Sequence, residues 1–218
     1  MLVKDAMTTN VVTVPSTTPV MEAMKIMDAH DFQRLPVVDK GKLVGIVTKN
    51  AILRASPSAA TSLSIWEINH LISKMTVKDI MVREVVTVPP ETAVESAVAT
   101  AQRHRVGALP VMEGDEIVGI MTTNDFFYRI LNPLLGIGEP GTRIIVYAAD
   151  TPPQIAEVME TLKEQKLEVK ALHSVSVPDA MGRDLIVHLA TEDTSKVEDE
   201  LKQHGFHVER RTHSPIQG

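Results

Sequence analysis

The sequence predicts two copies of a small α/β unit followed by a separate α+β domain. Three observations predict this organisation. Short blocks return without insertion 74 residues later, as from Val3 to Val77. Each copy shows the pattern strand, helix, strand, strand, helix. After a stretch rich in Gly and Pro at residues 132–141, the pattern changes to strand, helix, strand, strand, helix, strand. Self-similarity at a fixed spacing indicates a duplicated supersecondary unit.

The first copy opens with a helical turn at residues 3–7. The β-branched segment Val11–Val14 is predicted to be a short strand that ends at Pro15. Ser16 or Thr17 can cap the following helix, whose apolar face consists of Val20, Ala23, Met24 and Met27.

The rest of each copy is predicted to be a hairpin and a helix. In the first copy, strands at residues 34–38 and 43–48 flank a turn that contains Gly41, and a helix follows at 49–54. A unit of about 60 residues has a small core and would be marginal alone. We therefore expect the two copies to pack face to face, with two related clefts between them. A helix around Ser64–Ser73 is expected to brace the pair.

The last third predicts a split βαβ arrangement, which is called ferredoxin-like. The stretch at 132–141 is predicted to be a break between domains. The six elements that follow are expected at residues 143–148, 152–165, 168–177, 184–190, 193–204 and 206–211.

Composition excludes several classes of protein. The 218 residues include no Cys, so disulfides, thiol nucleophiles and thiolate metal sites are excluded. A net charge of −6 argues against broad nucleic-acid binding. No apolar run approaches the roughly 20 residues of a membrane span, and the N-terminus has no signal-like segment, so we expect a cytoplasmic protein. His204 and His207 are the closest pair of histidines, but no carboxylate accompanies them at ligand spacing, so no metal site is expected.

The repeated blocks resemble the CBS domain family. The shared features are a strand ending in Val-Thr-Val, a helix, Leu-Pro-Val at 35–37 and 109–111, and Gly-Ile at the centre of the third strand. The resemblance covers residues 1–132 and implies a tandem pair that binds an adenosyl ligand such as AMP, ADP, ATP or S-adenosylmethionine.

In that family, a Thr and an Asp after the third strand hold the phosphate and the ribose of the ligand. Copy two has both residues, Thr122 and Asp125, whereas copy one has Ala51 in place of the carboxylate. An ionised carboxylate only accepts hydrogen bonds and can take both protons of a cis-diol. The alternative interpretation of Asp125 is a helix cap.

A second difference between the copies concerns the residues before Leu-Pro-Val. Copy two has Val106, Gly107 and Ala108, whose small size suits an adenine slot, whereas Phe32, Gln33 and Arg34 would crowd the slot of copy one. The resemblance also implies that Arg34 and Gln33 cross to the site of copy two. The alternative for Arg34 is a solvated surface residue. We expect one competent and one degenerate site, and the predicted binding residues are Val86, Thr87, Val106, Gly107, Ala108, Pro110, Thr122, Asp125, Arg34 and Gln33.

The last third resembles an ACT domain, and the whole chain is similar to CBS–ACT proteins of the acetoin-utilisation AcuB type. Amino-acid-binding ACT domains commonly have Gly where Pro153 stands, and Pro has no N–H to offer a ligand, so a dimerisation role is favoured. The domains implied are CBS repeat 1 with its linker helix at 1–72, CBS repeat 2 at 73–132, a linker at 133–141, an ACT-like domain at 142–213 and a tail at 214–218.

These observations predict a non-catalytic regulatory protein. It would bind an adenosyl ligand between its repeats, need no resident cofactor, form a homodimer and act on an unidentified regulated protein. The alternatives are an interaction scaffold whose clefts bind nothing, an amino-acid sensor that uses the ACT-like domain, and an enzyme or metal protein.

Overall fold

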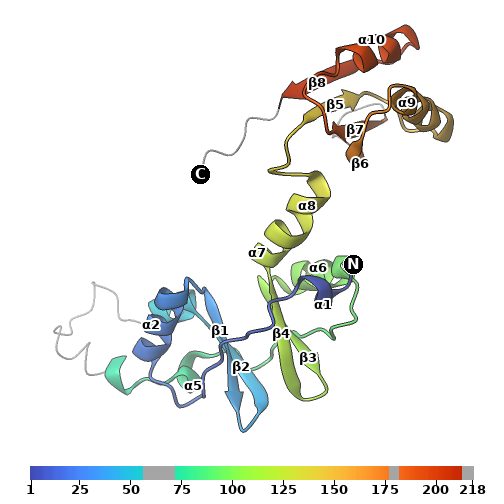
Figure 1. Ribbon diagram of the computed structural model, residues 1–218. Coiled ribbons are helices and arrows are strands. Elements are labelled where there is room, and N and C mark those ends of the chain that lie inside the picture. Colours follow the sequence, from blue (N-terminus) through green and yellow to red (C-terminus); the bar gives the residue numbers. More distant parts are fainter. Residues whose placement is uncertain (56–71, 177–181, 213–218) are drawn as a thin grey trace. The chain divides into compact units, whose positions relative to one another are not determined.

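The computed structural model describes residues 1–55, 72–176 and 182–212. The chain forms two compact units, Met1–Phe126 and Phe127–Gly218 (Figure 1). Each unit is described by itself. The predicted bracing helix around Ser64–Ser73 lies mostly outside the described residues. Among the described helices, none has the length and apolar character that a membrane crossing requires.

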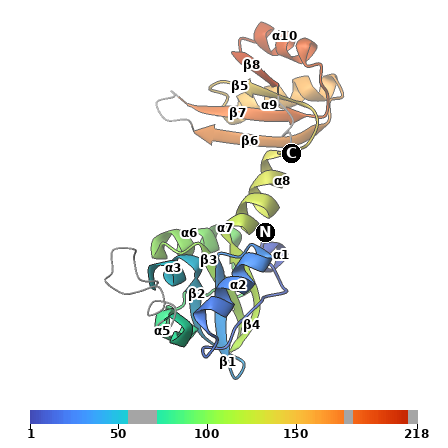
Figure 2. The ribbon, with the colours of Figure 1, turned by 90° about the vertical axis from the view of Figure 1, so that its left-hand side faces the viewer.

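Two matching hairpins form the centre of the first unit (Figure 2). Each pairs its strands antiparallel, with an irregularity at the same place, between Val37 and Val38 in one and between Val111 and Met112 in the other. The duplicated sequence therefore folds twice into one local structure. The hairpin strands are β1 (Arg34–Asp39) with β2 (Lys42–Thr48), and β3 (Ala108–Glu113) with β4 (Glu116–Thr122).

Helices flank each hairpin as the repeated pattern predicts. The long helices end at Asp31 and Arg105, which both adopt a left-handed conformation with φ of 54°. The helices are α2 (Val20–His30) and α3 (Lys49–Ala55) in repeat one, and α6 (Val94–His104) and α7 (Thr123–Asp125) in repeat two.

The N-terminal turn of each repeat packs on the other repeat. In α1 (Val3–Ala6) the Val3 N–H donates to the Thr92 carbonyl. In α5 (Val77–Ile80) the Val77 N–H donates to the Thr18 carbonyl, and Val77 belongs to the core of repeat one. The two repeats thus exchange their first segments, which the gapless duplication does not reveal.

The prediction that Val11–Val14 forms a regular strand is wrong. Only Val14 forms a bridge, to Val37, and its counterpart Val88 bridges Val111 in the same way. The segment from Thr8, which bridges Ile120 of repeat two, runs to Val14 on repeat one. A chain that passes between two hairpins cannot pair continuously with either of them, so its β-branched residues stay extended without a ladder.

Two methionine side chains pack each exchanged segment against the other repeat. A Cβ at Gly45 would lie 2.6 Å from the Sδ atom of Met81, and a Cβ at Gly119 would collide with Met7. Both glycines lie at the centre of a third strand, and each takes the methionine of the other repeat. The Gly in each Gly-Ile block therefore provides room for a flexible side chain that joins the repeats.

The second unit begins with helical turns where the sequence predicts a break. The segment η1 (Phe126–Leu131), a π-helix, leads into α8 (Asn132–Leu135), where Pro133 occupies the first turn and Gly136 ends the helix with φ of 62°. Pro suits the first helical turn because it lacks only an N–H that would be unpaired there. The first four residues of the stretch predicted to be a break between domains are therefore helical.

The remainder of the second unit follows the predicted order of elements closely. Its four strands form one sheet in the order β6-β7-β5-β8, and α9 and α10 pack against it around a core that includes Ile144, Val187 and Leu201 (Figure 2). The elements are β5 (Thr142–Val146), α9 (Pro152–Glu164), β6 (Val169–Ser176), β7 (Arg183–Leu189), α10 (Ser195–Gln203) and β8 (Val208–Thr212).

Candidate functional site

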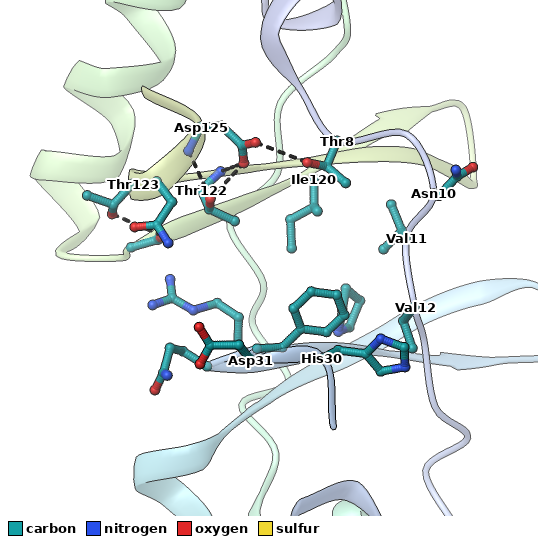
Figure 3. A pocket seen from close by; sticks show the side chains of 16 residues that line it. Thr8, Asn10, Val11, Val12, His30, Asp31, Ile120, Thr122, Thr123 and Asp125 are labelled. Carbon is teal, nitrogen blue, oxygen red and sulfur yellow. Dashed lines mark hydrogen bonds between the residues drawn. The ribbon is translucent and has the colours of Figure 1, made fainter. Parts of the chain in front are cut away.

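The first unit contains a cavity of about 330 Å³ between its two repeats (Figure 3). Both repeats contribute residues to the cavity. The N-terminal segment of repeat one, which crosses repeat two, contributes as well. The lining residues are Thr8, Asn10, Val11, Val12, His30, Asp31, Phe32, Gln33, Arg34, Pro36, Gly107, Ile120, Thr122, Thr123, Asn124 and Asp125.

Asp125 is the buried carboxylate of this cavity, and the residue is only 8% exposed. Its Oδ2 atom accepts hydrogen bonds from the Thr122 N–H at 2.8 Å and from the Thr122 hydroxyl at 2.6 Å. Its Oδ1 atom accepts a hydrogen bond from the Thr8 hydroxyl at 3.0 Å (Figure 3). These donors hold the carboxylate, and hydrogen bonding to the charged form is what permits its burial.

The interpretation of Asp125 as a capping residue is also correct. Thr122 and Asp125 form a reciprocal capping box at the start of α7. Thr76 and Asp79 form the same box at the start of α5, but Asp79 is exposed and does not line the cavity. Capping alone therefore does not require burial, and the position of Asp125 in the cavity is an additional property.

Arg34 supplies the cation of the cavity. It is half-buried at the start of β1, and burial lowers the pKa of its guanidinium. The guanidinium lies against the backbone of Gly107, where a Cβ would be 2.7 Å from Nη1. Gly107 is thus small because Arg34 of the other repeat occupies the space beside it.

Apolar side chains complete the walls. Phe32 stacks on His30, with ring centroids 5.2 Å apart and planes 16° from parallel. The other apolar lining residues are Val11, Val12, Pro36 and Ile120. Such walls with a few convergent polar groups are typical of small-molecule sites.

Of the ten residues that the sequence predicts for the site, half line the cavity. These are Arg34, Gln33, Gly107, Thr122 and Asp125. Thr87 lines a separate hollow beside Lys42 and Asp115. The remaining four are not among the lining residues: Val86, Val106, Ala108 and Pro110.

The exchange of the N-terminal segments explains this difference. The Thr8–Ile120 bridge carries Val12 of repeat one into the cavity, at the place assumed for its counterpart Val86. Phe32 and Pro36 likewise take the places assumed for Val106 and Pro110. Phe32, Gln33 and Arg34 all line the cavity that contains Asp125, so Gln33 and Arg34 lie at the site to which the resemblance implies that they cross.

Thr8 is the main residue that the sequence analysis missed. Its counterpart 74 residues later is Val82, so copy one alone has a hydroxyl at this place, just as copy two alone has Asp125. A comparison of the copies at every position would have shown this concerted pair of differences. Asn10, His30, Asp31, Thr123 and Asn124 were missed as well.

Comparison with known proteins agrees with this architecture. The CBS domain family matches residues 3–58 and 77–132. An inosine-5′-monophosphate dehydrogenase from Korarchaeum cryptofilum is 34% identical over 66% of this chain and 27% of its own length. The chain spans about a quarter of the length of this dehydrogenase and of two other curated relatives that it matches.

The crystal structures that are similar to this chain include the following two. The Vibrio cholerae protein AcuB, assigned to acetoin utilization, is 30% identical with a TM-score of 0.52, over 61% of this chain and 91% of its own. The CBS domain pair of protein MJ0100, in complex with 5′-methylthioadenosine and S-adenosyl-L-methionine, is 32% identical with a TM-score of 0.50, over 60% of this chain and 99% of its own. The duplicated fold, the paired repeats and the two family matches place this chain in the CBS domain family.

Proposed function

We propose that the cavity of the first unit binds one adenosyl ligand per chain and that the protein is a non-catalytic regulator. The observation that carries the proposal is the buried Asp125 carboxylate, which faces a cavity of suitable size with apolar walls. The ribose hydroxyls would donate to Asp125, and the adenine would lie among Phe32, Pro36 and Ile120.

The hydrogen bonds of Asp125 support this assignment. An ionised carboxylate can accept several hydrogen bonds, so ribose hydroxyls can join or replace those that Thr8 and Thr122 donate to Asp125. The Thr8 hydroxyl beside Oδ1 is a second group to which a neighbouring hydroxyl can bond. The complex of MJ0100 with two adenosyl compounds is a precedent among similar structures.

The related cleft should bind weakly or not at all. Its counterparts of Asp125 and Thr8 are Ala51 and Val82, which have no polar side-chain atoms. Without acceptors, ribose hydroxyls that left water would lose hydrogen bonds, which costs about 1–3 kcal/mol for each unsatisfied group. This asymmetry supports one ligand per chain.

Calorimetric titration of the full chain with adenosine, 5′-methylthioadenosine, S-adenosylmethionine, AMP and ATP tests the proposal. Saturable binding of at least one compound with a stoichiometry near one is expected. If none of them binds at millimolar concentration, the adenosyl-binding function is refuted and an interaction scaffold is favoured.

The C-terminal unit is proposed to be a ferredoxin-like, ACT-like dimerisation domain that relays the state of the cavity to a regulated protein. Its element order and its edge strand β6 support this part. A ligand that touches both repeats favours one arrangement of the repeats only by its difference in affinity for the two arrangements. Ligand-dependent change in small-angle scattering would test the relay.

A further inference from the structure

The charged residues that line the cavity indicate which kind of group is attached to the adenosyl part of the ligand. Among the described residues that line it, the fully charged groups are the cation Arg34 and the two carboxylates Asp31 and Asp125. These three side chains together carry one net negative charge. A terminal phosphate carries about 1.5–2 negative charges near pH 7, so a polyphosphate chain would meet one cation and an excess of carboxylates.

Asp31 is placed to bind a cation. It follows the last residue of α2 in a left-handed conformation, and its N–H donates to carbonyls of that helix, so its backbone is fixed. Its side chain is exposed at the cavity and lies on the wall opposite Thr122 and Asp125 (Figure 3). Within the described part of the chain, Asp31 makes no ion pair.

In the other repeat, the equivalent residue carries the opposite charge. The counterpart of Asp31 is Arg105, which ends α6 with the same φ of 54°. The conformation of the backbone therefore does not demand Asp at this place. The two repeats have opposite charges at this position. They also differ at the position of Asp125, where repeat one has Ala51 and no carboxylate.

Arg34 lines the same cavity as Asp31 and complements its charge. The guanidinium has five N–H donors in a planar fork that matches a carboxylate. It lies against Gly107 and is partly withdrawn from water, which strengthens a charge-assisted hydrogen bond. An α-amino acid has an ammonium group and a carboxylate. Asp31 can accept hydrogen bonds from the ammonium group, and Arg34 can donate them to the carboxylate.

Building on the adenosyl-binding function, we propose that the cavity selects an adenosyl ligand with an amino-acid tail over nucleoside di- and triphosphates. Asp31 binds the ammonium group of the tail, and Arg34 binds its carboxylate. The tail is a zwitterion without net charge, so it satisfies both side chains without adding to the negative charge of the site. S-Adenosylmethionine and S-adenosylhomocysteine belong to this ligand class.

The test is a calorimetric comparison on the full chain at one ionic strength, because charged ligands are screened differently as salt changes. The probes are S-adenosylhomocysteine, 5′-methylthioadenosine, which lacks the amino-acid tail, and ATP. S-Adenosylhomocysteine is expected to bind at least about tenfold more tightly than either of the others, from two charge-assisted hydrogen bonds.

The Asp31→Arg variant provides the matched change, since Arg105 shows that Arg is accommodated in this conformation. It should lower the preference for S-adenosylhomocysteine over ATP by at least about tenfold. ATP binding as tight as that of S-adenosylhomocysteine in the natural protein would overturn the selectivity and leave adenosyl binding intact. An unchanged preference in Asp31→Arg would also overturn it. Failure of all three probes to bind would instead refute the adenosyl-binding function itself.

Discussion

The Thr8 hydroxyl donates to Asp125 Oδ1 over 3.0 Å, although 117 residues separate the two in sequence. Thr8 belongs to the first segment of repeat one, which bridges Ile120 in β4, and Asp125 follows β4 in repeat two. The contact therefore joins the exchanged segment to the carboxylate of the cavity. It fixes one oxygen of Asp125 in a direction that capping of α7 alone would not determine.

Replacing Thr8 tests this contact. Thr8→Val removes the hydroxyl and keeps the shape, and Val82 already occupies the equivalent place in repeat two. Adenosyl affinity should fall about three- to tenfold, as expected for a lost hydrogen bond of about 0.5–1.5 kcal/mol. The double variant with Asp125→Ala should lose less than the sum of the two single losses, because the residues act together. Strict additivity in titration calorimetry would argue that Thr8 acts independently of Asp125.

Removing the carboxylate should have a larger effect. Asp125→Ala is expected to weaken adenosyl binding about ten- to a hundredfold, since charge-assisted hydrogen bonds contribute about 1.5–3 kcal/mol. The variant also breaks the capping box of α7. Asp79→Ala breaks the matching box of α5 away from the cavity and controls for that loss. Equal affinities of both variants in calorimetry would show that Asp125 only caps its helix.

The sequence predicted local structure better than the assembly of the site. Hairpins, helices and the six elements of the second unit follow from periodicity and turn residues, because these depend on neighbours in the chain. The cavity depends on which repeat the segment Thr8–Val12 crosses, and a gapless duplication has the same pattern in either case. For that reason Val86 and Val106 were predicted where Val12 and Phe32 line the cavity, whereas the predicted Asp125 and Arg34 do line it.

The contact between Gly107 and Arg34 leads to a third prediction. In Gly107→Ala the new Cβ would lie 2.7 Å from Nη1, so the guanidinium must move. Ligands with an anionic group should lose several-fold in affinity, about 1 kcal/mol, whereas adenosine should bind nearly as before. In an Arg34→Ala background, Gly107→Ala should cause no further loss. A similar loss for adenosine would show that Gly107 affects the adenine site by packing.

Acid stability should depend on Asp39. Its Oδ1 accepts a hydrogen bond from the Ser16 N–H at 2.9 Å, and this bond lowers the pKa of the carboxyl below its usual 3.8. A lowered pKa in the folded state stabilises the protein above the pKa of the unfolded state, and the contribution is lost as pH falls through the folded value. The free energy of unfolding measured with urea should therefore decline below about pH 4. This decline should be less steep in the Asp39→Asn variant.

The second repeat supplies the control for this titration. The counterpart of Asp39 is Glu113, and the counterpart of Ser16 is Pro90, which has no N–H to donate. Glu113→Gln should therefore leave the acid limb of the stability profile as steep as in the natural protein. If Asp39→Asn and Glu113→Gln alter the profile equally, the Ser16 hydrogen bond is not the cause.

The last prediction concerns the proposed homodimer. Strand β6 is an edge of the four-stranded sheet and, among the described strands, pairs only with β7. Unpaired edges expose N–H and C=O groups that favour pairing with a second chain, and a charged side chain on the edge opposes it. Leu172 on β6 is 38% exposed, so Leu172→Lys should shift the protein from dimer to monomer in light scattering at micromolar concentration. Met159 on α9 is 39% exposed, and Met159→Lys should leave the dimer intact. A natural protein that is already monomeric would refute the dimer, and a dimer that survives Leu172→Lys would place its interface away from β6.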